Sequence, residues 1–140
     1  MRGNLEQVDL TISPPGIQMT NGMAVAWLLA NFGTTAVDPN ADPDHDGASN
    51  YAEYIAGTNP NDANSVFKFS KAQFLGGGIT QLQWPSATDR FYTVMQANGL
   101  NAGFTAIATN LAATPPTNTR LVTNSTTGGP YFWKLNVVYP

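Results

Sequence analysis

Acidic residues are crowded into one part of this sequence, and this crowding limits how that part can fold. Of the nine acidic side chains, five fall between positions 38 and 53, and no Lys or Arg lies between Arg2 and Lys68. Carboxylates packed together without cations repel one another, which raises the free energy of a compact arrangement. The segment therefore either stays solvated or folds around a cation.

The spacing of these residues predicts a calcium loop. Reading from Asp42, the letters DPDHDGASNYAE fit the twelve-residue pattern D-x-D-x-D-G-x5-E of EF-hand loops. Calcium takes six to eight oxygen ligands, and alternate residues of a tight loop can point their carboxylates at one centre. The predicted ligands are Asp42, Asp44, Asp46, the Ala48 carbonyl, Asn50 and Glu53. Gly47 fits the sharp turn because glycine adopts positive φ at little cost.

Two other interpretations of the loop are weaker. It could be a solvated acidic turn that caps a helix beginning near Ser49. A zinc site is disfavoured because His45 is the only histidine and the chain has no cysteine. Ser49 also occupies the loop position where paired EF-hands place an aliphatic residue, so the sequence predicts an unpaired loop.

A second ion is an open alternative. Oxygen-bearing side chains continue on both sides of the loop, at Asp38, Asn40, Asn59, Asn61 and Asp62. An ion shared through Asp42 would use some of these residues as ligands. Otherwise they are turn residues.

The first half of the chain is predicted to contain two short helices. One helix is expected over 21–32, with Thr20 or Asn21 as its N-cap and Gly33 just after its end. The other is expected over 51–56, ended by Gly57. We therefore expect a helix, calcium loop, helix segment over 20–65. Residues 1–19 are expected to be extended, and Leu5–Ile12 could supply an extra strand.

From Val66 onward the sequence changes to a period of two. Short runs of β-type residues are separated by Gly, Pro and Asn, at 66–74, 79–84, 91–96, 104–108, 120–123 and 131–139. Six short strands at this spacing predict a small antiparallel β-sandwich over 66–140, of the immunoglobulin or fibronectin III kind. The predicted fold class is α+β, with the helical segment packed beside the sandwich.

Positions 42–60 resemble a known family. The run DPDHDGASNYAEYIAGTNP is similar to the thrombospondin type 3-like, dockerin-like calcium segments of bacterial secreted proteins. The resemblance implies calcium on Asp42, Asp44, Asp46, Asn50 and Glu53. It also implies an accessory module of a larger exported protein, secreted or held at the cell surface beside that protein's other domains. Residues 59–63 are a poor second copy of the loop, which disfavours cohesin binding.

Composition disfavours several classes of function. The net charge of −3 and the scattered basic residues provide no clustered positive charge that would bind the phosphates of nucleic acid. The apolar run 23–32 is shorter than the roughly 20 residues of a membrane span. No catalytic pair or triad is evident, because the acidic residues outside the loop are isolated in sequence. We therefore expect no enzyme.

Binding to a polysaccharide or a cell-surface glycan is an alternative function. Sugars stack on exposed aromatic rings, and the candidates are Trp84, Tyr92, Tyr131 and Trp133. The competing interpretation is that these rings are core, because aromatic side chains in alternating strands bury large areas. An adhesion or protein-partner role is a further alternative, for which the sequence identifies no partner.

Overall fold

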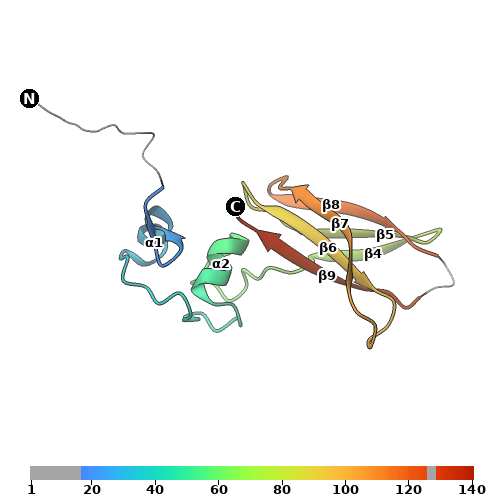
Figure 1. Cartoon of the computed structure of the whole chain (residues 1–140), viewed down its shortest axis with the longest axis horizontal. Coiled ribbons are helices and arrows are strands. Elements are labelled where there is room, and N and C mark those ends of the chain that lie inside the picture. The colour runs from blue at the N-terminus through green and yellow to red at the C-terminus, as the bar shows by residue number, and fades with distance from the viewer. Residues whose placement is uncertain (1–16, 126–128) are drawn as a thin grey trace, which may run out of the picture.

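Two antiparallel sheets form the second half of the chain in the computed structural model, which describes residues 17–125 and 129–140 (Figure 1). One sheet has the strand order β4-β5-β8 and the other β7-β6-β9. The strands are β4 (Lys71–Gly76), β5 (Ile79–Pro85), β6 (Phe91–Ala97), β7 (Thr105–Ala112), β8 (Thr117–Thr123) and β9 (Phe132–Val138). The predicted α+β class with a small antiparallel sandwich is confirmed at this level.

The core of the sandwich follows from the alternation of side chains along its central strands. On β5 the buried residues are Thr80, Leu82 and Trp84, and on β6 Tyr92 and Val94 are buried. Because successive side chains of a strand point to opposite faces, each of these sets lies on one face. Leu82, Trp84, Tyr92 and Val94 then form one cluster between the sheets. Full burial of each large apolar side chain stabilises the fold by about 1.5–3 kcal/mol.

The first strand of the sandwich begins later than the sequence predicts. Residues 66–74 were expected to be extended and paired, but β4 begins at Lys71. Phe67 and Phe69 still pack against the sandwich core, so the alternating apolar residues of this stretch reflect burial even without strand pairing. Ser70 donates its backbone N–H to the Gln83 carbonyl, and the regular ladder begins at the next residue.

The helical segment precedes the sandwich, and its first element differs from the prediction. Residues Met19–Thr20 (β2) and Met23–Ala24 (β3) form a short antiparallel hairpin. Asn21 and Gly22 both have positive φ, at 53° and 80°, which suits the two-residue turn of such a hairpin. Helix α1 therefore spans Val25–Phe32, and the prediction of a helix capped at Thr20 or Asn21 is wrong.

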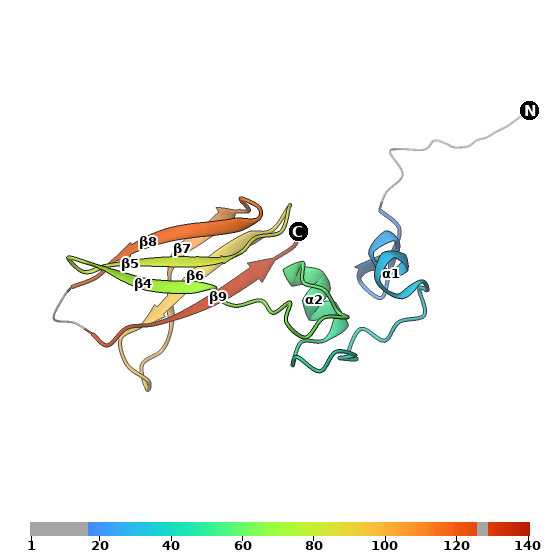
Figure 2. The ribbon, with the colours of Figure 1, turned by 180° about the vertical axis from the view of Figure 1, so that it is seen from behind.

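Helix α2 agrees with the sequence prediction. It spans Asn50–Ala56, and the Ser49 side chain accepts a hydrogen bond from the Ala52 N–H as an N-cap. The helix ends at Gly57, which has a φ of 80° in the left-handed region. Figure 2 shows α2 lying between α1 and the end of the sandwich.

A small second core joins the helical segment to the sandwich. Met23, Leu28 and Tyr54 are its buried members, and Tyr139 from the end of the chain packs against them. Tyr54 and Tyr139 lie with their ring centroids 5.2 Å apart. This contact places α2 against the strand that ends the sandwich, β9, as predicted for a segment packed beside it.

The predicted extended segment over 1–19, including Leu5–Ile12, lies almost entirely outside the described residues. Within the part of the chain that is described, no helix is long and apolar enough to cross a membrane.

The glycine that ends α2 provides a test of the contact between helix and sandwich. A Cβ at Gly57 would collide with the Ala87 Cβ, whereas a Cβ at Gly33, at the end of α1, would meet nothing within 4 Å. Both glycines have positive φ, so Gly33→Ala reports the backbone cost alone, about 1 kcal/mol. We expect Gly57→Ala to lower the free energy of unfolding by about 2 kcal/mol or more in urea melts. Equal losses in the two variants would show that a Cβ at residue 57 does not collide with Ala87.

Candidate metal centre

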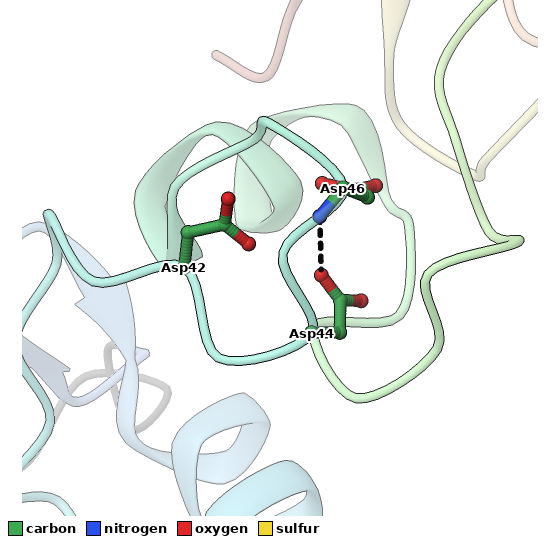
Figure 3. Close-up of side chains that lie close together, drawn as sticks. All are labelled: Asp42, Asp44 and Asp46. Atoms are coloured by element: carbon green, nitrogen blue, oxygen red, sulfur yellow. Dashed lines mark hydrogen bonds between the residues drawn. The ribbon is translucent and has the colours of Figure 1, made fainter.

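The loop from Asp42 to Glu53 wraps its carboxylates around one centre. Asp42 Oδ2 accepts a hydrogen bond from the Gly47 N–H at 3.0 Å, and Asp46 Oδ1 accepts one from the Ala48 N–H at 2.7 Å. The Asp46 N–H donates to Asp44 Oδ1 at 3.2 Å, as Figure 3 shows. One oxygen of each aspartate is thus tied to the loop backbone, which fixes the direction of the other.

Carboxylate oxygens of these three aspartates lie close together. One ligand oxygen from each of Asp42, Asp44 and Asp46 lies within 4.8 Å of the others. These are three of the four ligands that the sequence pattern places on acidic residues. No other group of three or more acidic, His or Cys side chains lies so close together in the described part of the chain.

Helix α2 brings two more oxygen donors to the same loop. Asn50 is 2% exposed, and its amide nitrogen donates to the Asp38 carbonyl at 2.9 Å, which fixes the amide plane. Glu53, one helical turn later, is fully buried. Because the Ser49 cap fixes where α2 begins, it also sets the positions of both side chains.

Six oxygens at this site are buried without a hydrogen-bond partner among the described residues. They are Asp42 Oδ1, Asp44 Oδ2, Asp46 Oδ2, Asn50 Oδ1, and both Glu53 oxygens. A buried polar atom without a partner costs about 1–3 kcal/mol, and more when it is charged. A cation among these six oxygens, which come from four acidic side chains and one amide, would offset this cost. The donor set consists of oxygen alone, which suits calcium.

The electrostatics of Glu53 point the same way. Burial, and after it the negative charges of Asp44, Asp46 and Asp42, raise the pKa of the Glu53 carboxyl to about 7. The nearby Thr58 side chain offsets part of the effect. Glu53 lies outside the tight group of three aspartates, yet it is close enough to experience their charge. A divalent cation at the centre would remove this repulsion.

The other predicted loop residues occupy consistent positions. Gly47 has a φ of 100°, which confirms the sharp turn that the sequence predicts there. His45 is exposed with a φ of 61°, and it belongs to no cluster of ligating side chains in the described residues. The ligand role of the Ala48 carbonyl stays a prediction.

The residues suggested for a second ion form local turns. Asp38, Asn59 and Asp62 each accept, through Oδ1, a hydrogen bond from the backbone N–H two residues later. Asn61 donates its side-chain amide to the Asn31 carbonyl. Asn40 is exposed beside the Asp38 turn. Among the described residues, these side chains have no buried oxygen without a partner, unlike those of the loop.

The aromatic candidates for ligand binding separate into two pairs. Trp84 and Tyr92 are fully buried, with ring centroids 5.7 Å apart in the sandwich core, so their prediction as ligand-binding residues is wrong. They belong to the inward faces of β5 and β6, where the alternation directs them. Tyr131 and Trp133 are partly exposed.

One residue important to the segment was missed by the sequence reasoning. Arg90 is only 9% exposed and donates to the carbonyls of Tyr54 at 2.6 Å and Ile55 at 3.0 Å, both near the end of α2. Its guanidinium also lies over the Tyr139 ring, 3.7 Å from the centroid. A single arginine after a turn has no sequence pattern that signals this role.

The chemistry of this loop is therefore inferred from its geometry. No protein-family model, no curated protein and no solved structure matches this chain.

Proposed function

We propose that the chain is a non-catalytic calcium-binding module, in which one calcium ion braces a helical segment against a β-sandwich. The observation that carries the proposal is the set of six buried oxygens without hydrogen-bond partners among the described residues. They come from the residues that the twelve-residue pattern assigns as side-chain ligands. Calcium would neutralise the carboxylates and satisfy the buried oxygens at once.

Calcium would brace the module through α2, which lies between the loop and the sandwich. Two of the ligands, Asn50 and Glu53, belong to α2, so an ion at the loop holds the first turn of this helix. Arg90 and Tyr139 hold its other end through hydrogen bonds and ring contacts. Calcium thus fixes one end of α2 and the sandwich the other.

The setting of the module is part of the proposal. The resemblance of residues 42–60 to thrombospondin type 3-like and dockerin-like segments supports a module of a larger secreted or cell-surface protein. The crossing strand connections support an immunoglobulin-like or fibronectin III-like sandwich. The chain crosses between the two sheets, so that β5 pairs with β8 and β6 pairs with β9, as in a Greek key.

Calorimetric titration of the full chain with calcium, after removal of bound metal, tests the proposal. We expect one ion per chain, with Kd between roughly 10⁻⁴ and 10⁻³ M, the range of extracellular calcium modules rather than of cytosolic buffers. Glu53→Gln should weaken binding at least about tenfold because it removes a charged ligand that offers two oxygens.

The matched control is Asp89→Asn. Asp89 is an exposed acidic residue outside the loop, and asparagine tolerates its φ of 63°. This variant should bind calcium like the unmodified chain. A stoichiometry of two, lowered to one by Asp62→Asn, would revive the second site. No heat of binding up to 10 mM calcium would remove the proposal.

A further inference from the structure

The sandwich is open at the end that lies away from α2. Phe74 of β4 pairs with Thr80 of β5, and Trp133 of β9 pairs with Gln96 of β6. Thr80 shares the inward face of β5 with Leu82, so Phe74 is directed toward the space between the sheets. Yet Phe74 is 67% exposed, so the described residues leave most of its ring uncovered.

A groove of about 330 Å³ occupies this open end. Its aromatic walls are Phe74, Tyr131 and Trp133. The indole N–H of Trp133 donates to Gln96 Oε1 at 2.9 Å, and the Tyr131 hydroxyl donates to the Ser125 carbonyl at 3.3 Å. Both hydrogen bonds restrict the rings before any ligand arrives, which lowers the entropy cost of binding.

The polar groups of the groove are all neutral. Thr80 and Asn124 line it beside the three rings, and none of the described residues that line it carries a charge. A phosphate or carboxylate ligand is usually held by Lys or Arg, and neither lines the groove in the described part of the chain. Aromatic faces flanked by hydroxyl and amide groups suit a ligand with apolar C–H faces and many hydroxyls.

We propose that this groove binds a neutral carbohydrate, with a sugar ring stacked on Phe74 and Trp133 and its hydroxyls bonded to Thr80 and Asn124. The site is distinct from the calcium loop. Figure 1 places the β4–β5 turn and the start of β9 at the opposite end of the sandwich from α2. Carbohydrate binding here does not depend on the proposed role of the metal.

The test uses affinity electrophoresis of the full chain in gels that contain a soluble β-glucan, a xylan or a mannan, with calcium present throughout. We expect retardation in at least one of these neutral polysaccharides. Phe74→Ala should weaken the binding about tenfold, the loss expected for one stacked aromatic ring. Since Phe74 is largely exposed, this variant should keep its fold.

Phe104→Ala is the matched control, because Phe104 is a second exposed phenylalanine that does not line the groove. It should bind like the unmodified chain. Absence of retardation in all three gels overturns the proposal, as does an equal loss in the two phenylalanine variants. Retardation only by an anionic polygalacturonate gel overturns it too. A dimer in sedimentation equilibrium that Phe74→Ala dissociates would assign the groove to a second copy of the chain instead.

Discussion

Removing calcium should lower the melting temperature of the full chain by about 9 °C. Calcium at a hundredfold excess over its Kd stabilises a folded state that alone binds it by about 2.7 kcal/mol. Unfolding entropy of about 2.1 cal/mol/K per residue, taken over 140 residues, converts this free energy into the stated shift. Differential scanning calorimetry with calcium, and then with excess EDTA, measures it.

The control for this experiment is the Glu53→Gln variant. Its shift should fall to about 5 °C or less, because a site at least tenfold weaker keeps at most a tenfold excess of calcium over its Kd, which stabilises the fold by about 1.4 kcal/mol. Magnesium at the same concentration should stabilise the unmodified chain less, since the smaller ion demands octahedral geometry and dehydrates reluctantly. A melting temperature that EDTA leaves unchanged in the unmodified chain would contradict the bracing role.

Arg90→Ala is expected to have the second large effect, a loss of about 3 kcal/mol in the free energy of unfolding. The Arg90 guanidinium donates to three carbonyls, on Tyr54, Ile55 and Thr88, and a hydrogen bond to a charged group contributes about 1.5–3 kcal/mol. Losing a buried arginine also leaves these carbonyls unpaired. Urea unfolding followed by tryptophan fluorescence measures the loss.

Packing around this contact explains why one arginine matters so much. A hollow of about 600 Å³, lined by side chains that include Tyr51, Ile55 and Phe67, remains between α2 and the sandwich. Apolar packing on this side of the helix is therefore incomplete, and Arg90 and the Tyr54–Tyr139 contact hold the helix to the sandwich. Arg120→Ala is the matched control, since Arg120 is exposed on β8, and it should cost less than about 0.5 kcal/mol. Equal losses would mean that Arg90 does not connect the two parts.

Local sequence signals were sufficient where the structure depends on local chemistry. Helix α2, its Gly57 terminus and the turn at Gly47 follow from capping and from φ requirements that involve neighbouring residues alone. Five strands lie close to the predicted ranges because the alternation of apolar residues records which face is buried. The first turn of α1 was misassigned because Asn21 suits both an N-cap and a hairpin turn.

These local signals did not predict the contacts between residues far apart in the sequence. The burial of Trp84 and Tyr92 depends on which sheet faces which, and alternation alone does not determine that. The pairing of Arg90 with α2 joins residues about 35 positions apart in sequence, with no pattern to indicate it. The groove at Phe74 and Trp133 likewise depends on where the edge strand β4 ends and the edge strand β9 begins in space.

A crystal structure of the full chain grown with calcium, with anomalous scattering data, tests the central claim most directly. We predict one anomalous peak inside the loop, about 2.3–2.6 Å from oxygens of Asp42, Asp44, Asp46, Asn50 and Glu53 and from the Ala48 carbonyl. A loop without an anomalous peak at millimolar calcium, with its carboxylates turned toward solvent, would contradict the account.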